Sequence, residues 1–150
     1  MTAPVAPTTP AMYIAQYLSE GGVGVYPWVG APLKNSWPIF IGYEGETGEE
    51  SIVVADTQGR GDGRNHRTGE SIVHPGIQIR IRHPIHEVGY AKTDGIAKLL
   101  DTLHNRALVV VGVTRKIVAV TRIGDIMTMG AAEGDRRQNF SINAILTFDA

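Results

Sequence analysis

The organisation of this chain follows from the stretch Ile77-Gln78-Ile79-Arg80-Ile81-Arg82, in which apolar and polar residues alternate strictly. Successive side chains of a β-strand point to opposite faces, so the three isoleucines share one face and the two arginines share the other. The strand ends at His83-Pro84, because proline has no amide hydrogen to donate to a sheet. The pattern predicts a strand with one buried face and one basic face.

A helix is predicted directly after this strand, in the run from His86 to Arg106. Its apolar residues recur at helical spacing and form one stripe, made of Ile96, Leu99, Leu100 and Leu103. We expect this stripe to cover the isoleucine face of the strand. The resulting packing unit holds no evident catalytic group, which favours a structural protein over an enzyme.

Length and composition bound the class of protein. The chain has 150 residues, the usual size of one domain, and it contains no cysteine, which excludes a disulfide framework and thiolate chemistry. A formal charge of −1, from 14 Lys and Arg against 15 Asp and Glu, argues against a dedicated nucleic-acid binder. The first residues lack the features of a signal peptide, and no apolar run is long enough for a membrane span.

The remaining patterns predict an α+β fold, with a mostly antiparallel sheet of about six strands and two helices packed on one face. Residues 1–9 are expected to form a flexible arm, and residues 10–150 a single domain that opens with a helix after Thr9-Pro10. The first two strands are expected to pair as a hairpin, 108–113 to be a central strand, and 124–135 to be rich in turns. The expected strands are 37–43, 51–56, 77–82, 108–113, 115–122 and 137–149.

A long loop is expected at 57–75, where glycines and charged residues lack any periodicity. Its Arg-Gly-Asp tripeptide, from Arg60 to Asp62, matches an integrin-binding motif, but a tripeptide match is weak evidence. The loop is either a mobile surface segment or one that orders against a partner. In the second case, its arginines would pair with acidic groups or phosphates.

Other clusters of polar side chains leave alternatives open. Arg80 and Arg82 either meet acids within the fold or line an interface or a channel. A metal-dependent hydrolase using His74, His83 and His86 is an alternative function, although Pro84 prevents a regular helical face there. Asp101 lies one helical turn before His104, and the two residues either belong to a charged, solvated helix face, which is the default interpretation, or pair with each other. No serine or cysteine is placed as a nucleophile.

The second half of the chain resembles the tail terminator, or tail completion, proteins of long-tailed bacteriophages. The resemblance lies in residues 77–103, in the glycine-rich stretch before them and in residues 136–150. The matching pattern is a strand with alternating arginines, a break, a helix, and later strands with an Arg-x-x-φ-Ser-φ-Asn ending. The residues at such places are Arg80, Tyr90, Ala91, Leu100, Arg137, Phe140, Ser141 and Asn143.

The resemblance implies a structural virion protein of the tail or neck, assembled in the host cytoplasm, with no enzymatic activity and no cofactor. Such proteins form a hexameric ring that ends the tail tube and meets a head–tail connector or stopper protein. DNA passes through the ring without sequence-specific binding, and no membrane is involved. Another head–tail joining or tail-tube ring protein is the alternative. The candidate contacts to subunits or partners are Arg60, Asp62, Arg64, Arg67, Arg80, Arg82, Arg136 and Arg137.

Overall fold

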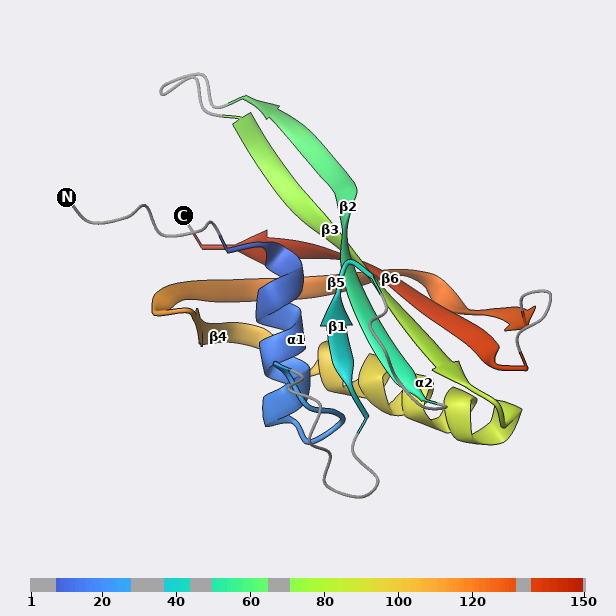
Figure 1. Cartoon of the computed structure of the whole chain (residues 1–150). Helices are drawn as coiled ribbons and strands as arrows, with labels where there is room; N and C mark the ends of the chain where they lie inside the picture. Colours follow the sequence, from blue (N-terminus) through green and yellow to red (C-terminus); the bar gives the residue numbers. More distant parts are fainter. Residues whose placement is uncertain (1–7, 28–36, 44–49, 65–70, 132–135, 150) are drawn as a thin grey trace.

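The fold is a curled six-stranded sheet with two helices, as the α+β prediction requires (Figure 1). The computed structural model describes residues 8–27, 37–43, 50–64, 71–131 and 136–149, with the backbone alone for 60–64 and 71–73. Neither helix of this described part is long and apolar enough to cross a membrane. The helices are α1 (Pro10–Glu20) and α2 (His86–Asp101). The strands are β1 (Ile39–Ile41), β2 (Ser51–Arg64), β3 (Ser71–His83), β4 (His104–Val110), β5 (Val113–Ala131) and β6 (Gln138–Phe148).

Strand β3 lies inside the sheet, and its isoleucine face forms the centre of the core. The strand order is β1-β2-β3-β6-β5-β4, so β3 is hydrogen-bonded on one side to β2 and on the other to β6. Ile77, Ile79 and Ile81 are fully buried, each contributing about 1.5–3 kcal/mol of hydrophobic stabilisation. The same core cluster contains residues of both helices, such as Ile14 of α1 and Leu100 of α2. The predicted packing of a strand under a helix is confirmed.

Both predicted helices are present, with small changes at their ends. Helix α1 begins at Pro10, as predicted, and ends at Glu20. Helix α2 stops at Asp101, before the expected end at Arg106, because the chain turns at Thr102 and β4 begins at His104. Most of the predicted N-terminal arm lies outside the described residues.

The predicted hairpin of residues 37–43 and 51–56 is wrong in direction. Strands β1 and β2 pair in parallel, with Ile39 opposite Ile52 and Ile41 opposite Val54. An alternating pattern reports which side chains face the core, but it carries no information about strand direction. Here the direction follows from long-range backbone bonds, such as the one from the Ile52 N–H to the Pro38 carbonyl (2.9 Å).

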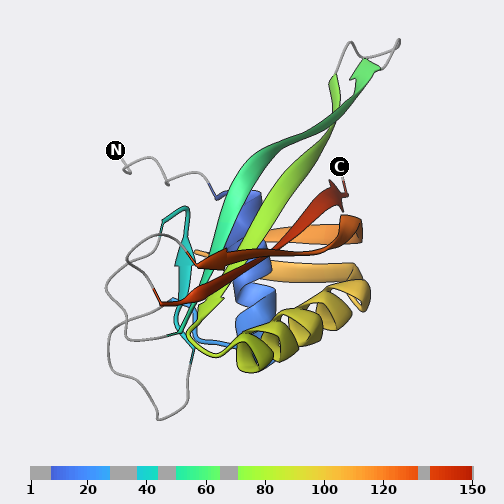
Figure 2. The ribbon, with the colours of Figure 1, turned by 90° about the vertical axis from the view of Figure 1, so that its right-hand side faces the viewer.

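The predicted loop at 57–75 is also corrected, because β2 and β3 continue through most of it as a two-stranded ribbon. Figures 1 and 2 show the ribbon extending away from both helices. The ribbon extends beyond the core, so neither of its faces has to be apolar. The alternation of apolar and polar residues that marks a half-buried strand is therefore missing from its sequence. Gly59 has φ +67° and sits at a register shift, where a Cβ atom would collide with the His74 carbonyl oxygen.

Two predictions for the second half of the chain also change. The apolar run at 108–113 was expected to be central, but β4 is an edge strand and Val109 is exposed. The expected turn-rich segment 124–135 is strand as far as Ala131, because β5 continues through it with register shifts against β6. Glycines at 124 and 130, both with positive φ, accommodate these irregularities. They are the residues that made the segment resemble turns.

Candidate functional site

The face of β3 opposite the core carries a row of polar cross-strand pairs. Gln78 lies opposite Asn143 on β6, and the Nε2 of Gln78 donates to Asn143 Oδ1 (3.3 Å). Two pairs further along the same face, Arg82 lies opposite Asn139, and its Nε donates to Asn139 Oδ1 (2.7 Å). This charge-assisted bond is short, and it orients the guanidinium along the sheet.

Arg80 lies between these two pairs, opposite Ser141 of β6. Its Nε atom is buried and has no hydrogen-bond partner among the described residues. A cavity of about 260 Å³ opens beside it, lined by Arg80, Arg82, Met129, Ala131 and Asn139. A buried donor without an acceptor costs about 1–3 kcal/mol, so this position favours an acceptor from outside the described fold.

Arg136 and Arg137 lie at the same end of the sheet as Arg82. They directly precede β6, whose first residue, Gln138, pairs with His83 at the end of β3. Arg136 is exposed and Arg137 is half-buried. The fold thus brings four of the predicted arginines to one end of the sheet, which we call the arginine end: Arg80, Arg82, Arg136 and Arg137.

The other predicted contact residues belong to the ribbon. Arg60 and Arg64 lie on β2 opposite His74 and Ser71 of β3, and Asp62 lies between them on the same strand. The Arg-Gly-Asp tripeptide is therefore part of a strand. Arg67 lies outside the described residues.

The two groups of contact residues lie at opposite ends of the β2–β3 pair. Ser51, opposite Arg82, marks the arginine end, and Arg64 marks the far end of the ribbon on the same strand. At a rise of about 3.3 Å per residue these positions are roughly 40 Å apart. The predicted residues therefore do not form one site. They form two groups at opposite ends of the β2–β3 pair.

The histidines of the alternative metal site have unrelated partners. Among the described residues, no three His, Cys, Asp or Glu side chains come together to hold a metal ion. His74 Nδ1 is hydrogen-bonded to Thr147 Oγ1 (3.2 Å), and His83 Nδ1 accepts the Ile85 N–H (2.9 Å). His86 is exposed, and its ring lies edge-on to the buried Phe140. The described geometry gives the metal-dependent hydrolase no support.

The polar residues on α2 also have structural partners. The alternative pair of Asp101 with His104 is not formed, because both oxygens of Asp101 accept bonds from Arg122 of β5 (2.9 and 3.0 Å). His104 Nδ1 is instead hydrogen-bonded to the Thr102 carbonyl oxygen (3.0 Å). Hydrogen bonding to Asp101 raises the pKa of Arg122 above its usual value. This fork-shaped pair ties the end of α2 to the sheet.

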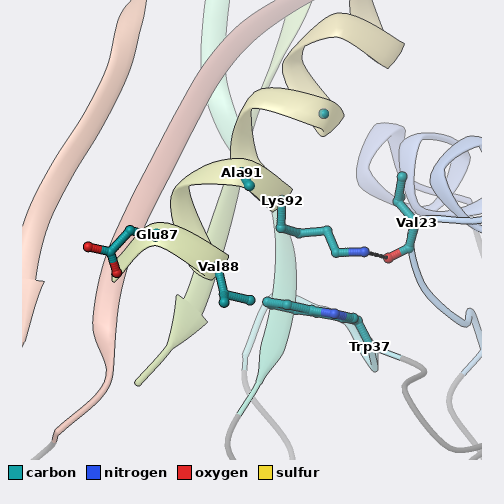
Figure 3. A pocket seen from close by; sticks show the side chains of 7 residues that line it. Val23, Trp37, Glu87, Val88, Ala91 and Lys92 are labelled. Atoms are coloured by element: carbon teal, nitrogen blue, oxygen red, sulfur yellow. Dashed lines mark hydrogen bonds between the residues drawn. The ribbon is translucent and has the colours of Figure 1, made fainter. Parts of the chain in front are cut away.

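A surface pocket that sequence reasoning missed lies between α2 and the segment before β1 (Figure 3). Its volume is about 550 Å³, and its lining includes Val23, Trp37, Glu87, Val88, Ala91 and Lys92. We call it the Trp37 pocket. The described residues of its walls come from three separate parts of the chain, so no local motif could have revealed it.

The walls of the Trp37 pocket are held in place by polar contacts. Lys92 Nζ donates to the Val23 carbonyl oxygen (3.0 Å) and lies 5.0 Å from the centroid of the Trp37 ring. Stacking on His83, with ring centroids 5.3 Å apart, fixes the indole further. Burial lowers the pKa of Lys92. Figure 3 shows Glu87 turned away from Lys92, so the interior of the pocket is mainly apolar.

A second missed feature is the turn between β4 and β5. Val110 pairs with Val113, and the two residues between them, Val111 and Gly112, have φ +49° and +74°. Positive φ at both central positions is the geometry of a type I′ hairpin turn, which Asn-Gly suits best. A valine is strained there, at a cost of about 1–2 kcal/mol. The sequence Val-Val-Val-Gly-Val gives no turn signal of the usual kind.

Comparison with known proteins agrees with the resemblance found in the sequence. A sequence model of the family described as Bacteriophage tail terminator protein matches residues 17–149. No curated protein matches the chain. The matched segment contains the ribbon, the arginine end and the Trp37 pocket. The resemblance first seen in 77–103 and 136–150 is therefore confirmed and extends over nearly the whole chain.

Proposed function

Because this chain belongs to the bacteriophage tail terminator family, a family of structural tail proteins, we propose that it assembles into a hexameric ring. The ring ends the growth of the tail tube and joins the tube to a head connector or stopper protein. The protein then resides in the neck of the virion after assembly in the host cytoplasm. DNA passes through the ring without sequence-specific contacts, in keeping with the formal charge of −1.

The observation that carries this proposal is the ribbon of β2 and β3. Strand β1 pairs with β2 only at residues 52–54, and β6 pairs with β3 only from Gly76 onward. Beyond these points no described strand covers either outer edge of the ribbon. A two-stranded hairpin is marginally stable alone in water, and open strand edges pair readily with another chain. We assign the ribbon to the contact with the neighbouring subunit.

The arginine end lies at the other end of the β2–β3 pair and is assigned to a different neighbour. Its separation of roughly 40 Å from the far end of the ribbon, at about 3.3 Å per residue, lets one subunit meet two partners at once. We assign Arg80, Arg82, Arg136 and Arg137 to contacts with acidic groups of the tail tube protein or the connector. Guanidinium groups suit such contacts because they bind carboxylates through two parallel hydrogen bonds.

This function needs no catalysis and no cofactor. The polar side chains that resembled catalytic groups have structural partners, as Asp101 has in Arg122 and His83 in Trp37. We therefore propose that the protein acts by shape and assembly alone.

A second candidate is another ring protein of the head–tail junction or the tail tube. The long projecting ribbon favours it, since a long hairpin is also expected of tube proteins. A virus lacking the protein separates the two candidates by electron microscopy. A terminator predicts overlong tails or tails detached from heads, whereas complete absence of tails would assign the protein to the tube.

The ring itself is tested by light scattering coupled to size-exclusion chromatography. We expect the full chain to pass from monomer to hexamer as its concentration rises. A variant in which an Asn-Gly turn replaces residues 60–74 keeps the core and should remain a folded monomer. If that variant assembles like the full chain, the ribbon is not the subunit contact.

A further inference from the structure

The turn between β4 and β5 presents a strained apolar side chain to solvent. Val111 has φ +49° and is 70% exposed, and Val109 of the same hairpin is 54% exposed. Among the described residues only one other non-glycine has positive φ, and it is Asn105, a residue type that tolerates this conformation. The chain thus has a β-branched valine at a position where asparagine would be less strained.

An exposed valine in this conformation destabilises the isolated subunit in two ways, through backbone strain and through exposure of an apolar side chain to water. Backbone strain persists at such positions mainly where it serves a function, and exposed apolar side chains at the tip of a hairpin favour burial by a partner. An apolar contact that covers Val111 would explain why asparagine is absent. The turn therefore has the character of an anchor.

The Trp37 pocket has the shape and chemistry to receive it. Trp37, Val88 and Ala91 are among the residues that line it, and Val88 is 42% exposed. Its volume of about 550 Å³ exceeds that of one branched apolar side chain, so it has room for the side chain of Val111. Because Lys92 and His83 already hold Trp37, the walls are formed before any partner arrives.

We propose that the β4–β5 turn of one copy of this chain docks into the Trp37 pocket of the next copy. Figure 1 shows this turn and the first turns of α2 at opposite sides of the molecule, so a single copy does not fill its own pocket. A contact between two unlike surfaces of identical chains is head-to-tail, and repeated with rotation it closes a ring. The inference rests on the ring proposed above and names a pair of surfaces that hold it together.

The test compares two single variants with their combination. Val111→Asn removes the apolar anchor and suits the turn, and Ala91→Phe fills the pocket from an exposed position on α2. Each variant should raise the concentration for half-assembly at least tenfold in sedimentation velocity. If the two surfaces touch, the double variant raises it no further than the more severe single variant. Additive effects would overturn the pairing and assign the surfaces to different partners, such as the tube protein.

Controls separate assembly from folding. Tyr43→Asn removes another exposed apolar side chain and should assemble like the wild type. Val111→Asn should melt at the same temperature as the wild-type monomer or higher, because the strain is relieved. Wild-type assembly that is unaffected by either single variant overturns the docking but leaves the ring intact. If the wild type stays monomeric both in solution and on purified tail tubes, the proposed hexameric ring is wrong as well.

Discussion

Gly89 of α2 packs directly against the ring of Phe140 on β6, so closely that a Cβ atom would overlap the aromatic edge. This contact lets the start of α2 lie flat on the sheet, beside His86, whose ring meets Phe140 edge-on. A residue that weakens the helix in isolation is therefore required by its packing.

Replacing Gly89 by alanine should destabilise the protein by about 1–3 kcal/mol, because the core would be overpacked. The matched change at Gly95 of the same helix has the opposite sign. A Cβ there meets no atom within 4 Å, so Gly95→Ala should stabilise by about 0.5–1 kcal/mol through helix propensity. Urea denaturation of both variants measures the difference. Equal effects at the two positions would mean that the contact with Phe140 leaves room for a Cβ atom at Gly89.

The first turn of α1 is capped from a distant strand. The Ala11 N–H donates to Asp56 Oδ1 of β2 (2.9 Å), whereas Thr9 Oγ1, at the expected cap, has no partner among the described residues. Asp56→Ala should cost about 1 kcal/mol of stability, and Thr9→Ala a few tenths at most. Thermal melts of the two variants distinguish the caps. A larger loss from the threonine change would contradict this assignment.

Arg80 should matter more for assembly than for folding. Arg80→Glu reverses the charge where the buried Nε has no acceptor within the described fold, so partner binding should be lost. Arg80→Met should leave the free energy of unfolding within about 1 kcal/mol of the wild type, since no described bond is broken. Lys116→Glu, the same charge reversal on an exposed residue of β5, serves as the control. Loss of the cooperative melt in Arg80→Met would instead place Arg80 in an internal ion pair.

Lys92 should make stability depend on pH in the alkaline range. Burial holds the pKa of Lys92 below its usual 10.5, so between the folded and unfolded values only the unfolded chain keeps the proton. Stability from this group therefore increases as the pH rises toward 10.5. The free energy of unfolding of the wild type minus that of Lys92→Met should therefore increase over that range. A constant difference would show that the ammonium is as well solvated in the folded state as in the unfolded chain.

Periodicity was enough to identify the core of this protein. The isoleucines of β3 are buried as predicted, because burial of one face imposes its period on the local sequence. Of the predicted helical stripe, Ile96, Leu100 and Leu103 are buried and Leu99 is partly buried. The same patterns supported the α+β class. They also located the arginines of β3 on the face opposite the core.

Contacts between distant residues settled the rest. The parallel pairing of β1 with β2, the ribbon and the edge position of β4 depend on which strands meet, and alternation is silent on that choice. The separation of the candidate arginines into two surfaces follows from the same pairing. The Trp37 pocket joins three segments, and the strain at Val111 is visible only as a backbone angle. The local sequence determines which side of a strand or helix is buried, whereas the pairing of strands across the sheet depends on the packing of the whole chain.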